Sequence, residues 1–128
     1  MRILRTNVLA GAAITAMAWA AHAHHSGAAY DGTKTLRIEG VVETWRFANP
    51  HSSLQIRAAD GAGNAILWSF EGQPAGMLTP QGYRRNTFEP SAHVTVVYNP
   101  MKDGKPGGGR LVGAILRDGS TVGVVEPK

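Results

Sequence analysis

From Leu36 onward, apolar and polar residues alternate with a period of two, and this alternation constrains the fold more than any other feature of the chain. Successive side chains of a β-strand point to opposite faces, so this period predicts strands with one buried face. The segment LRIEGVVETW places Leu36, Ile38, Gly40 and Val42 on one such face. Four more strand candidates follow, separated by glycine-rich or Asp-Gly connections: SSLQIRAAD, AILWSFEG, HVTVVYN and GRLVGAILRDGS.

One short helix is predicted between the third and fourth strands, in the segment QPAGMLTPQGYRRNTFEPSA. Pro74 suits the first helical position, and Met77 and Leu78 are expected to face the core. Pro80 and Gly82 end the helix early. The order of three strands, a helix and two strands is that of an OB-like, five-stranded Greek-key barrel, an all-β fold with a small α content. The alternative, an immunoglobulin-like sandwich, needs about seven strands, whereas the sequence supplies five candidates.

The first 23 residues have the three parts of a secretory signal peptide. Arg2 and Arg5 form a basic head, an alanine-rich apolar run starts at Val8, and a small-x-small cleavage motif, AHA, stands at residues 21–23. A second motif, AWA at residues 18–20, is an alternative cleavage point, and an uncleaved anchor is a further alternative. The apolar run is short for a stable transmembrane helix, which needs about 20 strongly apolar residues. We therefore expect a periplasmic protein with no stable membrane span after cleavage.

The predicted organisation is a signal peptide at residues 1–23, a histidine-containing segment at 24–35 and the barrel at 36–128. Removing 23 of the 128 residues leaves 105, and the loss of two arginines lowers the formal charge from +4 to +2. That length suits one domain. The chain has no cysteine, which excludes disulfides and thiolate metal sites. No basic run exceeds Arg84-Arg85, so no nucleic-acid partner is expected.

Three of the five histidines lie between residues 22 and 25, and cleavage after Ala23 would make His24 the first residue of the mature chain. Its α-amine has a pKa of about 7.7–8.0 and its imidazole one of about 6.5, so both can donate nitrogen to a metal near neutral pH. Imidazoles of His25 and His51 could complete a nitrogen-rich set, which favours Cu(II) or Ni(II) and predicts a copper cofactor. This set is similar to the histidine brace of periplasmic copper carriers and copper-dependent polysaccharide oxygenases.

Each of these residues also has a structural interpretation. His51 follows Asn49-Pro50 in the expected connection between the first two strands, where it could simply hydrogen-bond its own turn. His24 and His25 could form a solvated tail. His93 is expected to be a surface residue of the fourth strand. Five aromatic residues could form either the core or a stacking platform for bases or sugars: Trp45, Phe47, Trp68, Phe70 and Tyr98. For Trp68 and Phe70, which alternate along one strand, the core is favoured.

Four segments together resemble a family of small exported bacterial proteins of unknown function: HHS at 24–26, NPH at 49–51, W-x-x-E at 68–71 and NPMKDGKPGGGRLVGAILRDGS at 99–120. The resemblance covers essentially the whole mature chain and implies a signal peptide, a periplasmic location and a small β-rich domain. It implies no activity. Where the family has a Gly-Asp turn before the fourth strand, this chain has Ser91-Ala92-His93, so His93 is interpreted as a local substitution.

Two functional hypotheses remain. The first is a small periplasmic binding protein that holds Cu(II) through His24, His25 and His51. The second is a metal-free binding or assembly module for an unidentified periplasmic protein or envelope component. An enzyme ranks third and would need the same copper, because the acidic residues show no spacing typical of a paired general acid and base. Ser26 and Ser52 each follow a histidine directly, and chain neighbours rarely form a nucleophile–base pair. No catalytic residue is assigned.

Overall fold

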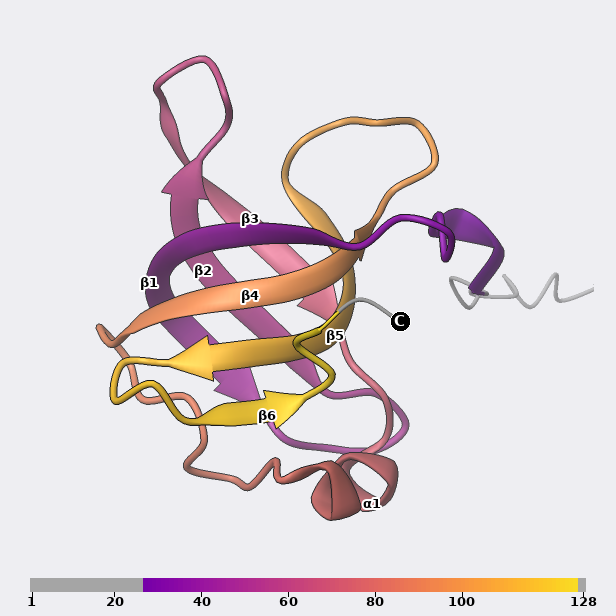
Figure 1. Ribbon diagram of the computed structural model, residues 1–128, viewed down its shortest axis with the longest axis vertical. Coiled ribbons are helices and arrows are strands. Elements are labelled where there is room, and N and C mark those ends of the chain that lie inside the picture. The colour runs from indigo at the N-terminus through magenta and orange to yellow at the C-terminus, as the bar shows by residue number, and fades with distance from the viewer. Residues whose placement is uncertain (1–26, 127–128) are drawn as a thin grey trace, which may run out of the picture.

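A computed structural model describes residues 27–126 and shows a strongly curled sheet whose strands cross in two layers (Figure 1). A short 3₁₀ helix, Gly27–Ala29, precedes the first strand, and a second, Thr79–Gln81, directly continues the one α-helix. The other elements, in chain order, are β1 (Leu36–Arg46), β2 (Ser53–Ala59), β3 (Ala65–Glu71), α1 (Ala75–Leu78), β4 (His93–Pro100), β5 (Gly108–Leu116) and β6 (Thr121–Gly123).

The strands follow the order β3-β2-β1-β4-β5-β6, and an additional parallel pairing of β3 with β5 closes the first five into a barrel. The closure consists of three residue pairs, Ser69–Gly108, Phe70–Gly109 and Glu71–Arg110, which we call the barrel seam. The predicted five-stranded OB-like barrel with a helix between β3 and β4 is thereby confirmed. The structure adds β6, a three-residue strand after the last Asp-Gly turn that the sequence analysis did not predict.

The β2–β3 hairpin owes its register to the predicted turn. Asp60 accepts hydrogen bonds from the backbone N–H groups of Ala62 (2.7 Å) and Asn64 (3.1 Å), while Gly61 and Gly63 take positive φ angles of 86° and 91°. Such angles cost glycine little. Counting outward from this turn pairs Ala59 with Ala65 and, at the far end of the hairpin, Ser53 with Glu71.

The alternating aromatic residues form the core, as favoured from the sequence. Trp68 and Phe70 are 6% and 1% exposed and stack with ring centroids 6.1 Å apart, and Tyr98 packs against both. Trp45 and Phe47 are partly buried against the same core. A stacking platform built on Trp68, Phe70 and Tyr98 is therefore excluded, because their faces are covered by other core side chains.

Helix α1 is short, as the sequence predicts. Pro74 is its N-cap and precedes the first helical residue. Leu78 is buried as predicted, but the prediction that Met77 faces the core is wrong, since its side chain is 55% exposed. A four-residue helix makes about one turn, so neighbouring residues on it point in different directions. Gly82, at φ 96°, ends the 3₁₀ turn that follows.

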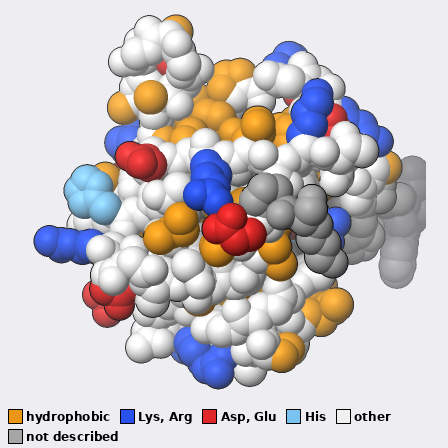
Figure 2. Space-filling model, viewed as in Figure 1, with side chains coloured by type: hydrophobic (Ala, Val, Ile, Leu, Met, Phe, Trp, Pro, Cys, Tyr) orange, Lys and Arg blue, Asp and Glu red, His pale blue; other side chains and the backbone are white. Residues whose placement is uncertain are grey.

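Positive, negative and hydrophobic side chains are interspersed on the face of the barrel seen in Figure 2. The described residues of this face therefore carry no extended patch of a single charge. Within residues 27–126, no helix has the length and apolar character needed to cross a membrane.

Candidate functional site

His51 lies in the connection between β1 and β2, as predicted, and the backbone around it is fixed by hydrogen bonds. The fully buried Ser52 accepts a bond from the backbone N–H of Ala48 (3.2 Å) and donates one to the carbonyl of Ala48 (3.3 Å). The backbone N–H of Ser52 bonds Gln73, and its carbonyl accepts from Gly72. The Asn49–Pro50 peptide bond is cis. This network holds the imidazole at one end of the barrel seam.

The imidazole faces a carboxylate. Nδ1 of His51 lies 3.3 Å from Oε1 of Glu71, with side chains 46% and 27% exposed. A carboxylate facing Nδ1 favours a proton on that nitrogen, which leaves the lone pair of the neutral ring on Nε2. Metal-binding histidines commonly have such a carboxylate partner, which fixes the ring's tautomer and orientation. The pair is therefore suited to present Nε2 to a ligand.

The second oxygen of the same carboxylate binds the N-terminal segment. The hydroxyl of Tyr30 donates a 2.9 Å hydrogen bond to Oε2 of Glu71. Burial, followed by the hydrogen bond to Glu71 and its charge, raises the pKa of Tyr30 to about 12. The hydroxyl therefore stays protonated at neutral pH and acts as a donor. Glu71 thus joins His51 to Tyr30.

Backbone pairing fixes the segment that carries Tyr30. Tyr30 forms an isolated antiparallel bridge with Met101. The N–H of Asp31 bonds the carbonyl of Pro100 (2.8 Å), and the N–H of Lys102 bonds that of Ala29 (3.0 Å). The described part of the chain therefore begins next to the β4–β5 loop, on the same side of the barrel as Glu71.

A polar row crosses the outer face of the barrel at this point. The strand registers pair Arg46 with Ser53, Ser53 with Glu71, and Glu71 with Arg110. Within the described residues, neither arginine forms an ion pair. A shallow cavity of about 390 Å³ lies over the row and is lined by Tyr30, Arg46, His51, Ser52, Ser53, Ser69, Phe70 and Glu71.

Of the three predicted metal ligands, only His51 lies within the described residues. His24 and His25 lie outside the described residues. His51 lies where the sequence placed it and does not only hydrogen-bond its own turn, because its ring faces a carboxylate on β3. Across residues 27–126, no three histidine, aspartate or glutamate side chains come close enough to hold a metal ion. His51 and Glu71 would therefore supply part of a metal site, and any further ligands must come from elsewhere.

Two further residues of this site were not predicted as site residues. Glu71 entered the sequence analysis only as the last residue of the W-x-x-E segment, although counting the hairpin outward from the DGAGN turn places it opposite Ser53, two positions after His51. Tyr30 has no comparable signal, because its position depends on the bridge to Met101. His93 is exposed at the start of β4, as expected, and lines a different cavity.

The fold and the site define a small closed β-barrel protein with a polar site on its seam. The chain belongs to the family of unknown function DUF6152, which it matches over residues 12–110. The match includes the three candidate ligands and extends to Arg110 at the end of the barrel seam. No curated protein and no solved structure matched the chain.

Proposed function

We propose that this is a small periplasmic protein that binds a transition metal, Cu(II) by preference, through His24, His25 and His51. The observation that carries the proposal is the shared carboxylate. Glu71 faces His51 with one oxygen and holds Tyr30 with the other, so the N-terminal segment is tied next to the candidate ligand.

Chain length allows the terminal histidines to reach His51. His24 lies six positions before Tyr30, and an extended chain spans about 3.3–3.6 Å per residue, so His24 has a reach of roughly 20 Å from Tyr30. Tyr30 and His51 line the same cavity. The distance therefore allows the three histidines to converge, whereas a tail attached at the far end of the barrel would have much further to go.

The proposed ligand set explains the choice of metal. Cleavage after Ala23 gives His24 a free α-amine, so one residue supplies two nitrogens, and His25 and His51 supply imidazoles. Nitrogen ligands in a tetragonal arrangement suit Cu(II) or Ni(II), and Cu(II) has the highest affinity among the divalent first-row metals. Glu71 would keep the His51 ring oriented, since loss of such a partner commonly weakens metal binding by about 10–100-fold.

The periplasmic location is part of the proposal. The basic head, the apolar run and the AHA motif at residues 21–23 support export and cleavage. Cleavage is also required chemically, because only a mature chain that begins at His24 has the terminal amine beside the first imidazole.

The test uses protein exported with its own leader, so that its terminus is natural. Intact mass identifies the first residue, and Cu(II) titrations compare this protein with His51→Ala and with a version carrying an extra glycine before His24. We expect a chain starting at His24, one-to-one binding, and affinity reduced at least about tenfold in both variants. Equal, weak binding by all three proteins would contradict the proposal and favour the metal-free binding or assembly module.

A further inference from the structure

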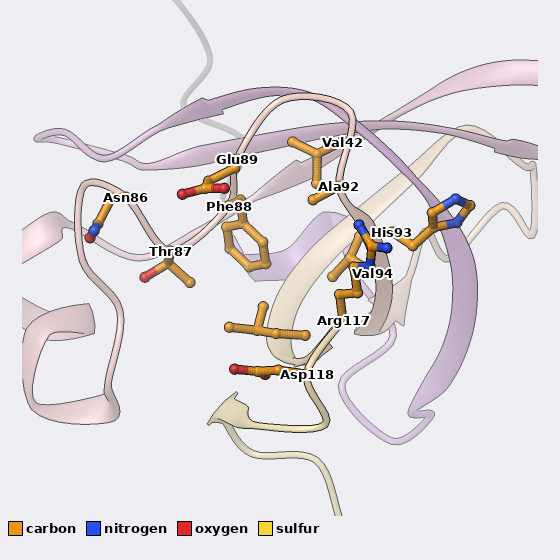
Figure 3. Close-up of a pocket in the computed structure, with 11 residues that line it drawn as sticks. Val42, Asn86, Thr87, Phe88, Glu89, Ala92, His93, Val94, Arg117 and Asp118 are labelled. Atoms are coloured by element: carbon orange, nitrogen blue, oxygen red, sulfur yellow. The ribbon is translucent and has the colours of Figure 1, made fainter.

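A second cavity, of about 470 Å³, opens away from the barrel seam, where the loop before β4 meets the β5–β6 turn (Figure 3). Its volume lies within the range of about 300–1,000 Å³ that is typical of small-molecule sites. Its lining residues are Val42, Asn86, Thr87, Phe88, Glu89, Ala92, His93, Val94, Leu116, Arg117 and Asp118.

The floor of this cavity is apolar and well supported. Val42, Phe88 and Val94 are 2%, 4% and 5% exposed, so they belong to the core and present only a small part of their surface. Phe88 packs edge-on against Trp45, with ring centroids 4.9 Å apart. A floor continuous with the core does not need to rearrange to receive an apolar group.

The rim carries charges of both signs in separate places. Figure 3 shows Glu89 on one side of Phe88 and Arg117, with His93 beyond it, on the other. Within the described residues, Glu89 and Arg117 have no ion-pair partner. The carboxylate of Asp118, by contrast, already has partners in its own turn, because its Oδ1 accepts hydrogen bonds from the N–H (2.9 Å) and the hydroxyl (2.5 Å) of Ser120.

Backbone contacts hold the loop on the acidic side in place. The N–H of Val42 bonds the carbonyl of Ala92 (2.9 Å), and the N–H of Ser91 bonds the carbonyl of Val42 (2.8 Å). Ser91 has a positive φ of 67°, an angle that residues other than glycine rarely adopt. The loop that carries Glu89 is thus held to Val42 of β1 by two backbone hydrogen bonds, so this wall of the cavity is fixed.

We propose that this cavity binds a small zwitterion with an apolar body, the chemistry shared by a free apolar amino acid and a short apolar peptide. The ammonium group lies toward Glu89, the carboxylate toward Arg117, and the apolar side chain on the Phe88 floor. Arginine suits a carboxylate because its planar fork can donate two parallel hydrogen bonds. This site does not depend on the metal site at the seam.

The test titrates the mature protein with the dipeptide Leu-Leu and follows backbone amide resonances. N-acetyl-Leu-Leu, which lacks the ammonium group, and Leu-Leu amide, which lacks the carboxylate, are matched probes. We expect saturable shifts at Phe88, Val94 and Leu116 with Leu-Leu, and affinity reduced about tenfold or more for each blocked probe. Free leucine distinguishes the two sources, since tighter binding than Leu-Leu indicates an amino acid and weaker binding a peptide.

Two variants assign the charges. Glu89→Gln should lower the affinity for Leu-Leu to that of the acetylated probe, and Arg117→Gln to that of the amide. Lys105→Gln, on the β4–β5 loop and outside this cavity, is the control and should leave binding unchanged. Absence of saturation up to about 10 mM for both Leu-Leu and leucine, or equal binding of the blocked and unblocked peptides, would overturn the proposal. The blocked probes need no mutation, so the result does not depend on whether a variant folds.

Discussion

The hydroxyl of Tyr30 donates a 2.9 Å hydrogen bond to Glu71, 41 positions further along the chain, whose other carboxylate oxygen faces His51. One side chain therefore holds both the segment that precedes the barrel and the loop between β1 and β2. Glu71 is also the last residue of the seam on β3. Tyr30 and His51, which lie far apart in the sequence, thus both contact the carboxylate of Glu71.

Tyr30→Phe should detach the N-terminal segment without unfolding the barrel. The substitution removes a hydrogen bond to a charged acceptor, so we expect the free energy of unfolding to fall by about 1–2 kcal/mol in a urea titration. Hydrogen exchange should become faster at the amides of Asp31 and Lys102, which bond Pro100 and Ala29. The amide of Leu116, which bonds Ser120 in the β5–β6 turn, is the internal control, and faster exchange there would indicate general destabilisation instead.

Alkaline pH should destabilise the fold through its tyrosines. Burial raises the pKa values of Tyr83 and Tyr98 above the ordinary 10.0, and burial together with Glu71 raises that of Tyr30 to about 12. The folded chain keeps these protons while the unfolded chain releases them, so their contribution is complete below about pH 10 and is lost as the pH rises toward 12. Urea titrations from about pH 8 to about pH 11.5 should show this loss. A constant free energy of unfolding over that interval would contradict the assignment.

Ser52→Ala should weaken the loop that positions His51. The hydroxyl bonds both the N–H and the carbonyl of Ala48. Its loss leaves the N–H of Ala48 without this acceptor, whereas the carbonyl keeps its 3.1 Å bond from the N–H of Ala75, so we expect a cost of about 1–3 kcal/mol. Ser53→Ala is a matched control on the next residue, whose side chain forms no hydrogen bond within the described residues. Similar losses of unfolding free energy in the two variants would show that the Ser52 bonds do not fix the loop.

Gly109→Ala should strain the seam. A Cβ at this position would lie 2.5 Å from the carbonyl oxygen of Asn99 and 2.6 Å from a ring carbon of Tyr98, so β4 or β5 must shift. We expect destabilisation of roughly 1–3 kcal/mol, measured by urea or thermal unfolding. Gly76→Ala in α1, where a Cβ meets nothing within 4 Å, should be neutral or slightly stabilising. Equal stability of the two variants would contradict the close packing of the seam.

The barrel could be predicted from the sequence because its signals are local. Period-two alternation, the DGAGN turn and the glycine and proline residues around α1 each act over a few residues, and together they give the strand order. The seam has no such signal, because parallel pairing of Glu71 with Arg110 joins segments whose connection contains α1 and all of β4. The three residues of β6 are too few for periodicity to reveal.

In the candidate site too, one residue could be placed from local sequence signals and the others could not. The placement of His51 between strands followed from Asn49-Pro50 interrupting the alternation. The positions of its partner Glu71 and of Tyr30, which bonds Glu71, depend on tertiary contacts, namely the hairpin register and the bridge to Met101. The prediction for Met77 was wrong for a local reason, because adjacent residues of a helix point about 100° apart, so Met77 and Leu78 cannot both face the core.

Because Glu71 belongs to both the seam and the His51 site, ligand binding at His51 should change the local stability of the seam. Three residue pairs close the seam, and Ser69 in the first of them donates its backbone N–H to the carbonyl of Gly107 at 2.9 Å. A ligand that binds His51 only while Glu71 is in place raises the free energy needed to open the seam locally. At a ligand concentration one hundred times the dissociation constant, this increase is about 2.7 kcal/mol. Slower hydrogen exchange at the Ser69 amide would therefore register a bound metal, even one that has no colour and no spectroscopic signal.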